Sequence, residues 1–354
     1  MTNFLIDTDI KLQNITKDLA NSKYIGLDTE FIRESTYYPN LALLQLSDEK
    51  NNYCIDILQI KENYLITNIL SNGNIKKIMH SSKQDLEVLN HYFNCYPVNI
   101  FDTQIAYNLL YSDMNISYSN LVKKYFDVDL KEGSWRTDWL KRPISDDKLE
   151  YAANDVKYLI QLCEILTNEL TIANRKEWFE EELNTDLSKK NIITEPSLSW
   201  EKINLPSNMQ NFQLSNLKLL SEWREQKAIS RNIPKRWIFS DSELIKLIMS
   251  KSARFNSVLE NLKHKPNEKD LEFIRNSCMI DKEEKYVRMQ ELDLNLYNST
   301  ISNCHNTLSN ICEKYKIASS LVANKRDIEL FARGKKDIKF LYGWRFKIFG
   351  KLVQ

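Results

Sequence analysis

The chain has 354 residues, of which 42% are hydrophobic and 27% are charged, values typical of a globular protein with two or three domains. Its 49 basic and 48 acidic residues leave a net charge of +1, so the overall charge does not indicate nucleic-acid binding. The sequence does not open with a basic leader and apolar core, and no run of about 18 apolar residues occurs, so we expect a cytoplasmic protein without a membrane segment.

Cysteine and glycine usage exclude further classes of protein. The six cysteines form no CxxC pair and only four histidines accompany them, which argues against a zinc site or a disulfide framework. Glycine is scarce, at 6 residues, and neither GxGxxG nor GxxxxGK[ST] occurs. Because loops that cradle phosphates need such glycines, we expect no nucleotide cofactor.

Hydrophobic periodicity predicts an α/β region followed by helices. Strand-length apolar runs occur at residues 24–32, 41–47, 53–57 and 77–80. Helical patterns occur at residues 82–93, 103–111, 116–126 and 146–168. This order indicates a mixed sheet flanked by helices. A polar stretch at 183–190 and the prolines Pro196 and Pro206 mark a linker, and from about residue 210 the pattern is helical.

The first predicted strand carries two carboxylates on one face. Side chains alternate between the faces of a strand, so Asp28 and Glu30 project to one side about 7 Å apart, while Leu27 and Thr29 project to the other. Two neighbouring carboxylates repel each other, and one should have a raised pKa unless a cation neutralises the pair. A pair that stays ionised therefore suggests hard divalent ions held by oxygen ligands.

The second acidic position, Asp85, lies at the start of a predicted helix. It follows Ser81 and Ser82 and falls in the first turn of the pattern at 82–93. The spacing from Ser82 to Asp85 approaches that of a capping box, and a carboxylate at a helix N-terminus is favourable in itself. Taken alone, Asp85 is explained more simply as a helix cap than as a metal ligand.

The third cluster pairs a phenol with a carboxylate. Tyr151 and Asp155 lie one helical turn apart in the pattern at 146–168, so they share a face while Ala152 and Val156 can face the core. Such a pair on its own is usually solvated and not catalytic. The occurrence of all three acidic clusters in one chain favours a two-metal nuclease site.

These clusters stand in motifs that resemble bacterial ribonuclease D, a family of the exonuclease superfamily named DEDD for its four acidic residues. The similar segments are GLDTEF at 26–31, YPNLALLQLS at 38–47, HSSKQDLEVL at 80–89, FDTQ at 101–104, WLKRPI at 139–144 and LEYAANDV at 149–156. The last segment has the tyrosine form of the third motif, and no acidic position is missing. The resemblance covers nearly all of residues 1–180 and implies an α/β fold of the ribonuclease H type there.

The resemblance also implies a catalytic role for each residue. The activity would be that of a 3′–5′ exonuclease with two divalent metal ions, Mg²⁺ or Mn²⁺, which releases nucleoside 5′-monophosphates. Asp28 would bridge both ions, and Glu30, Asp85 and Asp155 would complete their ligand sets. Tyr151 would orient the attacking water or help to deprotonate it.

Substrate contacts are predicted beside these motifs. The candidates are Thr29, His80, Arg136, Lys141 and Arg142. For the first two, packing or hydrogen bonding at a strand end is an alternative role. The other three lie in segment 131–142, which mixes positive charge with Trp135 and Trp139 as single-strand channels do. The two tryptophans could equally form a hydrophobic bracket against the helix of the third motif.

The helical half of the chain resembles two small all-α domains of ribonuclease D, called HRDC domains. The first resemblance lies at 217–224 and 231–234, and the second, which is more diverged, ends in LYGWR at 341–345. The predicted organisation is an exonuclease domain at 1–180, a linker at 181–208, an HRDC domain at 209–290 and an HRDC-like domain at 291–354. We expect the two small domains to grip RNA.

Local charge near the C-terminus is compatible with RNA binding. Between Lys314 and Lys351 the sequence has eleven basic residues and three acidic ones, a local charge of +8. Such a segment could neutralise several phosphates, which would make affinity fall steeply with salt. A solvated helical face is the alternative explanation.

The resemblance to ribonuclease D implies a 3′–5′ exoribonuclease that trims the 3′ ends of tRNA precursors and other small structured RNAs. Its partner would be RNA with a single-stranded 3′ end, and it would act as a monomer. Two alternatives are a DNA-directed exonuclease of the same superfamily and a catalytically inactive RNA-binding protein. The sequence has no polymerase or helicase motif, which argues against the first, and the intact set of acidic residues argues against the second.

Overall fold

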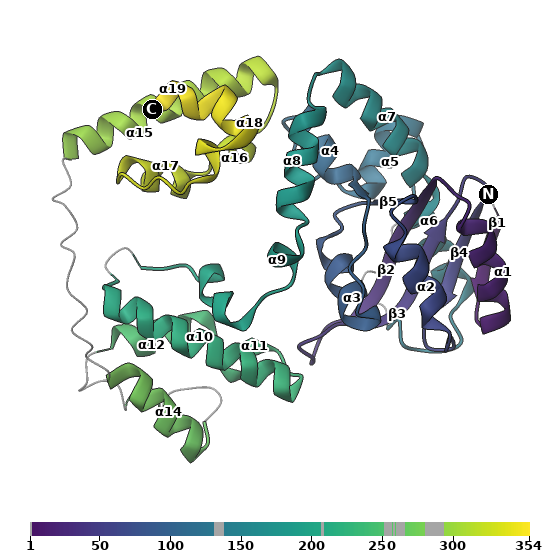
Figure 1. The fold of residues 1–354 in the computed structure, drawn as a ribbon, viewed down its shortest axis with the longest axis horizontal. Coiled ribbons are helices and arrows are strands. Elements are labelled where there is room, and N and C mark those ends of the chain that lie inside the picture. The colour runs from purple at the N-terminus through teal and green to yellow at the C-terminus, as the bar shows by residue number, and fades with distance from the viewer. Residues whose placement is uncertain are drawn as a thin grey trace. The chain divides into compact units, whose positions relative to one another are not determined.

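The computed structural model describes residues 2–130, 138–206, 209–250, 257, 259, 266–279 and 294–354. Backbone contacts divide the chain into two compact units. The first unit contains Met1–Phe31, Leu41–Ile192 and Gln290–Gln354, and the second contains Ile32–Asn40 and Ile193–Met289 (Figure 1).

Six described strands of the first unit form one sheet. They are β1 (Thr2–Ile6), β2 (Tyr24–Ile32), β3 (Asn40–Ser47), β4 (Asn51–Asp56), β5 (Lys76–Met79) and β6 (Ile100–Asp102). Their order across the sheet is β1-β4-β3-β2-β5-β6, with β1 parallel to β4, β2 parallel to β5, β5 parallel to β6, and β3 antiparallel to β4. Only residues 33–39 connect β2 to β3, too few for a parallel crossover, so this pair is antiparallel as well. The predicted mixed sheet is confirmed.

The predicted strands at 24–32, 41–47, 53–57 and 77–80 correspond to β2, β3, β4 and β5. The sequence patterns missed β1 and β6. In β1, Ile6 is the one buried residue, so the strand shows no alternation, and β6 has only three residues. Both strands are held by pairing with neighbours far away in the sequence.

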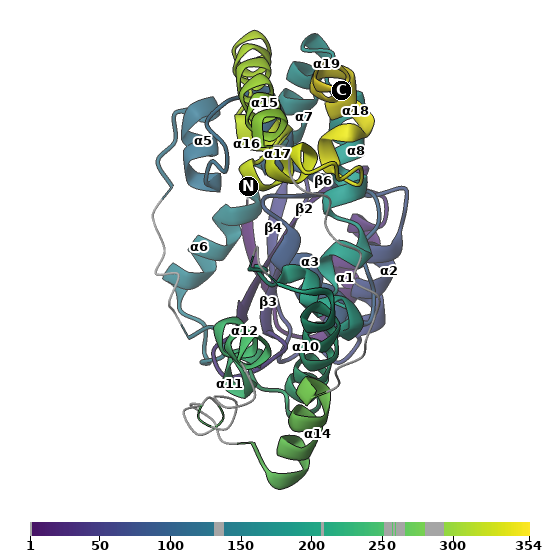
Figure 2. The ribbon, with the colours of Figure 1, turned by 90° about the vertical axis from the view of Figure 1, so that its left-hand side faces the viewer.

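Helices cover both faces of the sheet. The helices before the C-terminal segment are α1 (Asp9–Leu19), α2 (Asn63–Ser71), α3 (Lys83–Phe93), α4 (Thr103–Leu110), α5 (Tyr118–Phe126), α6 (Asp146–Lys157), α7 (Leu159–Ile172), α8 (Lys176–Asp186) and α9 (Lys189–Ile192). Leu27 of β2 is buried in one cluster with residues of α1, α2 and α3, whereas Ile78 of β5 is buried in another with residues of α4 to α7. Figure 2 shows α6 and the group α1 to α3 on opposite sides of the strands.

The helix predicted at 146–168 is two helices, α6 and α7, which meet at Tyr158. The backbone of Tyr158 has φ −108° and ψ 0°, outside regular helix geometry. The Tyr118 hydroxyl accepts a hydrogen bond from the Tyr158 N–H at 3.0 Å and donates one to the Asn154 carbonyl at 3.1 Å. A tertiary contact therefore satisfies the backbone at the break, and continuous periodicity could not reveal it.

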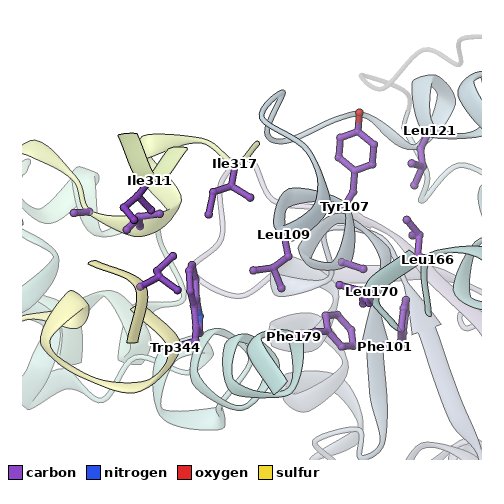
Figure 3. Close-up of a cluster of buried hydrophobic side chains, with 14 of the residues drawn as sticks. Phe101, Tyr107, Leu109, Leu121, Leu166, Leu170, Phe179, Ile311, Ile317 and Trp344 are labelled. Carbon is purple, nitrogen blue, oxygen red and sulfur yellow. The ribbon is translucent and has the colours of Figure 1, made fainter. Parts of the chain in front are cut away.

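The C-terminal segment of the first unit is helical and shares a core with the exonuclease region. It contains α15 (Leu294–Tyr315), α16 (Ser319–Val322), α17 (Lys325–Ala332), α18 (Gly343–Arg345) and α19 (Lys351–Val353), with a 3-10 turn at Lys339–Leu341 and a π-helical turn at Phe346–Gly350. Figure 3 shows Ile311, Ile317 and Trp344 of this segment in one buried cluster with Leu109 and Phe179.

A second set of contacts joins this segment to α8. The rings of Trp178 and Trp344 stack with centroids 4.5 Å apart. Glu182, which is 3% exposed, accepts hydrogen bonds from the Trp344 indole at 3.0 Å and from the two terminal nitrogens of Arg345. The segment is therefore held by a buried ion pair as well as by apolar packing.

In the residues that the structure describes, the second unit consists of helices and the loop Ile32–Asn40. Its elements are a 3-10 helix at Pro196–Lys202, α10 (Asn211–Arg231), α11 (Lys235–Ile238), α12 (Asp241–Met249) and α14 (Glu268–Met279). The loop Ile32–Asn40 belongs to this unit, where the Tyr37 hydroxyl donates to Glu225 at 2.6 Å and the Asn232 side chain accepts from the N–H groups of Tyr37 and Tyr38 at 3.2 Å. These contacts keep the loop against α10.

The predicted division at residues 180, 208 and 290 stays a prediction. The chain between 181 and 208 contains the end of α8, the short α9 and a 3-10 helix, and the boundary at 290 falls outside the described residues. In the described ranges, no helix combines the length and apolar character that crossing a bilayer requires.

Candidate active site

Three carboxylates meet between β2 and α6. Asp28 and Glu30 project from one face of β2, as the alternation predicted, and Asp155 reaches them from α6. Ligand oxygens of all three lie within 4.8 Å of one another. The structure therefore brings together carboxylates that are more than 120 residues apart in the sequence.

Gly26 allows α6 to approach the strand this closely. The Ser47 hydroxyl of β3 donates a hydrogen bond to the Val156 carbonyl of α6 at 2.9 Å, directly beside Gly26. A Cβ atom on Gly26 would lie 2.3 Å from the Ser47 Oγ and 2.9 Å from the Val156 carbonyl oxygen. Glycine inside a strand often marks such a close backbone approach, a signal that was present in the sequence but not used.

Gly26→Ala is therefore expected to displace α6 and with it Asp155. A shift of about 1 Å in a catalytic group typically lowers turnover about 10²-fold. Turnover and thermal unfolding of Gly26→Ala should be compared with those of Gly73→Ala, because a Cβ on Gly73 meets no atom within 4 Å. Wild-type turnover in Gly26→Ala would show that the close approach does not set the position of Asp155.

Asp85 is buried in the first turn of α3 and hydrogen-bonded to the strand. It is 8% exposed and accepts a hydrogen bond from the Thr29 hydroxyl on β2. Ser82 occupies the N-cap position, but its hydroxyl donates to Asp102 at 2.7 Å instead of capping the helix. The capping-box explanation for Asp85 is therefore not what the structure shows.

Asp102 supports the turn that delivers Asp85, a role the sequence reasoning did not assign. Its carboxylate accepts hydrogen bonds from the N–H groups of Ser81 and Ser82, at 3.3 and 2.8 Å, and also caps α4. Ser81 has φ +57°, a conformation that non-glycine residues rarely adopt, so the turn needs such support. The FDTQ motif was the available signal, but it gave no partner for Asp102.

The carboxylates are strongly perturbed electrostatically. Burial raises the pKa of Asp28 well above its usual range, and the charges of the other three carboxylates raise it further. Burial, followed by the charges of Asp155 and Asp85, raises the pKa of Glu30 to about 9. Burial is also the main cause that raises the pKa of Asp85 and of Asp155 to about 7.

This donor set fits divalent cations. In the described part of the chain, the ion pairs with Lys or Arg include none of the four carboxylates. Buried acids that repel each other without a cationic side chain are stabilised in the ionised state by a bound cation. Because all the donors are carboxylate oxygens, Mg²⁺ or Mn²⁺ suits them better than a softer metal.

Tyr151 lies beside this cluster and keeps its proton at neutral pH. Its hydroxyl is hydrogen-bonded to Asp155, and burial, followed by the charge of Asp155, raises its pKa above the usual value of 10. Trp139, which is 4% exposed, packs against it with ring centroids 6.2 Å apart. Trp139 therefore packs against the helix of the third motif, which is one of its two predicted roles. Trp135 lies outside the described residues.

Two of the predicted substrate contacts are occupied by other partners. The His80 Nδ1 lies 2.9 Å from the Thr103 hydroxyl and its Nε2 lies 3.0 Å from the Ile116 carbonyl, and burial lowers its pKa. The Arg142 guanidinium makes five hydrogen bonds, two of them to Asp56 at 2.7 Å, and five is the number it can donate. Both side chains hold the protein's own loops in place.

The other predicted contacts have different surroundings. Thr29 is buried and bonded to Asp85, whereas the Lys141 side chain is exposed. Arg136 lies outside the described residues. Substrate binding by all five candidates, including His80 and Arg142, stays a prediction.

Part of the basic charge near the C-terminus is used within the first unit. Arg345 is buried against Glu182, and Lys339 lies 3.3 Å from both Glu182 and Asp186. Lys347 lies 3.5 Å from Glu177. These contacts attach the segment to α8, so they reduce the charge that it can offer to phosphates.

Comparisons with known proteins agree with this geometry. Residues 3–171 match the family model for 3′-5′ exonucleases, and residues 213–254 match the model for the HRDC domain. The match to an HRDC model covers only the first of the two predicted domains of this type, so the second stays a prediction.

Relatives are similar over nearly the whole chain. Ribonuclease D of Zymomonas mobilis is 32% identical over 98% of this chain and 92% of its own length, and that of Sphingobium indicum is 31% identical over 97% and 92%. The crystal structure of Escherichia coli RNase D, an exoribonuclease involved in structured RNA processing, superposes with a TM-score of 0.84 at 26% identity, covering 100% of this chain and 98% of that one. The chain therefore belongs to the ribonuclease D family and is a 3′–5′ exoribonuclease.

Proposed function

We propose that the enzyme removes nucleoside 5′-monophosphates from RNA 3′ ends at the four-carboxylate cluster, with two divalent ions, Mg²⁺ or Mn²⁺, as cofactors. The observation that carries this proposal is the group of three carboxylates within 4.8 Å, with Asp85 and Tyr151 beside it. Bound divalent ions would activate the attacking water and stabilise the charge on the phosphate and on the leaving oxygen.

The protein's residues would then have distinct tasks. Asp28, Glu30, Asp85 and Asp155 are the proposed ligands. Tyr151 keeps its proton at neutral pH, so it suits a donor that orients the water better than it suits a general base. The hydrogen bond to Asp155 sets the direction of the phenol.

We also propose which RNAs the enzyme acts on, which is a more specific statement than its exoribonuclease activity. E. coli RNase D is described as acting in structured RNA processing. We infer a similar role for this chain, trimming the 3′ trailers of tRNA precursors and other small structured RNAs, as a monomer and without a nucleotide cofactor. The requirement for a free single-stranded 3′ end follows from cleavage of one terminal nucleotide at a time.

The test is degradation of a 3′-extended tRNA transcript and of a single-stranded DNA of matching sequence, each with Mg²⁺, Mn²⁺ or EDTA. We expect metal-dependent release of mononucleotides from the RNA and little from the DNA, because a 2′-hydroxyl distinguishes the two. If the DNA is degraded as fast as the RNA, the alternative of a DNA-directed exonuclease is supported instead. RNA that is bound but intact in every lane would leave an RNA-binding protein without catalysis.

Tyr151→Phe is expected to lower kcat about 10²-fold without weakening RNA or metal binding. The variant loses the hydroxyl that orients the water but keeps the ring that packs on Trp139, and a positioned proton donor or acceptor typically contributes 10²- to 10⁴-fold. Single-turnover rates and RNA affinity in Ca²⁺ would be measured together. Normal turnover would remove Tyr151 from the mechanism.

A further inference from the structure

Gln45 is a buried amide without a partner. It lies on β3, is 0% exposed, and neither its Nε2 nor its Oε1 has a hydrogen-bond partner. Buried side-chain amides are normally hydrogen-bonded, because an unmet donor or acceptor away from water is costly. An orphaned amide of this kind points to a partner that is present in another state of the site.

The strand geometry places Gln45 across from Asp28. Ser47 and Gly26 are direct neighbours on β3 and β2, since a Cβ on Gly26 would lie 2.3 Å from the Ser47 Oγ. In the antiparallel pair, two residues back along β3 correspond to two residues forward along β2, so Gln45 lies opposite Asp28 on the same face. Opposed Cβ atoms in such a pair are about 5 Å apart, within reach of a glutamine side chain.

The other neighbours of Gln45 do not satisfy its amide. Its partner on β4 is Cys54, whose Sγ is 3.8 Å from the Leu149 carbonyl of α6. Helix α6 therefore covers this face of β3 and β4. The carboxylate of Asp28 is the strong acceptor that the strand pairing places beside Gln45.

We propose that Gln45 is a positioning residue of the carboxylate site, and this inference rests on the proposed function. With the site loaded, the Gln45 N–H group would donate a hydrogen bond to the Asp28 carboxylate, its neighbour across the two strands. The bond fixes the carboxylate orientation in which it serves as a ligand. Outer-shell partners of this type typically change metal affinity 10- to 100-fold when they are removed.

The test measures Mn²⁺ binding without substrate, by the electron paramagnetic resonance signal of free Mn²⁺. Gln45→Met keeps the length of the side chain and removes the amide. It is expected to weaken Mn²⁺ binding about tenfold and to raise the melting temperature in EDTA, where the orphaned amide is a cost. A purely structural role would instead lower that temperature. Gln45→Leu is the second variant if Gln45→Met does not fold.

Asn52→Leu is the matched control. Asn52 is a buried amide on the same face, opposite Ser47, and its Nδ2 donates to Asn3 at 2.9 Å, away from the carboxylates. The Mn²⁺ affinity of the Asn52→Leu variant should stay within about twofold of that of wild type. If wild type and Gln45→Met bind Mn²⁺ equally, the role of Gln45 is overturned while the proposed function stands. If wild type binds no Mn²⁺, the proposed function itself fails.

Discussion

Asp28→Asn is expected to abolish RNA degradation and, in the absence of metal, to stabilise the fold. The loss of activity should be at least about 10³-fold, because a metal site supplies several kcal/mol of transition-state stabilisation and each 1.4 kcal/mol is worth a factor of ten. The amide has nearly the shape of the carboxylate, so packing around β2 is kept. An inactive variant that is also more stable cannot be explained by unfolding.

The gain in stability follows from the sign of the pKa shifts. Burial raises the pKa of Asp28 in the folded state above its usual value of 3.8. A group of this kind contributes stability that is complete below its unfolded pKa and is lost as the pH rises through its folded pKa. Glu30, with a pKa of about 9, and Asp155, with a pKa of about 7, behave in the same way. Wild type in EDTA should therefore lose stability progressively from about pH 4, near the unfolded pKa values of these carboxyls, up to about pH 9, the folded pKa of Glu30.

Thermal unfolding in EDTA across this pH range measures the effect. Asp28→Asn should lose less stability than wild type as the pH rises, and Mn²⁺ should stabilise wild type much more than the variant. Asp129→Asn is the control, because Asp129 is exposed and its ion pair within the described residues is with Lys123, which is also exposed. Equal pH dependence of wild type and Asp28→Asn would show that the carboxylate cluster does not cause the loss of stability with rising pH.

Local periodicity was enough to predict which of the acidic side chains on β2 and α6 share a face, but not which contacts position them. Alternation along β2 placed Asp28 and Glu30 on one face, and the four-residue spacing placed Tyr151 beside Asp155. The same alternation set Thr29 on the opposite face, yet it could not show that its hydroxyl meets Asp85, 56 residues away. Contacts of this range depend on how β2 and α3 pack, which a one-dimensional pattern does not contain.

The packing of the C-terminal helices could not be predicted from the sequence for the same reason. The LYGWR segment was predicted to close a second HRDC-like domain, which stays a prediction, but no packing partner could be predicted for it; in the structure Trp344 packs on Trp178 and joins the core that contains Phe179. The two residues of α8 that contact this segment, Trp178 and Glu182, are not distinctive in the sequence, because tryptophan and glutamate are both ordinary in helices. Only the tertiary contacts show that this segment packs against α8.

Glu182→Ala is expected to lower the free energy of unfolding by about 3–5 kcal/mol and to release the C-terminal segment. The side chains of Glu182 and Arg345 are 3% and 4% exposed, and removal of one member of a buried pair leaves the other charge uncompensated. The variant also leaves the Trp344 indole N–H without its acceptor. Urea unfolding and limited proteolysis, with cleavage expected after residue 294, measure the two consequences.

The control for this prediction is Glu177→Ala, on the same helix and also facing the C-terminal segment. Glu177 lies 3.5 Å from Lys347, but the two side chains are 86% and 69% exposed, so the pair is screened by water. Its loss should change the unfolding free energy by less than about 0.5 kcal/mol. Comparable effects of the two variants would mean that apolar packing alone holds the segment.

Acid should reproduce the effect of Glu182→Ala in the wild-type protein. Burial opposes ionisation of Glu182, but the hydrogen bonds and charge of Arg345 outweigh it and hold the pKa below its usual value of 4.5. The stability from this pair is therefore present above about pH 4.5 and is lost as the pH falls through the lower, folded pKa. Protease sensitivity of the C-terminal segment should rise in that acidic range in wild type, whereas in Glu182→Ala it should already be high at neutral pH.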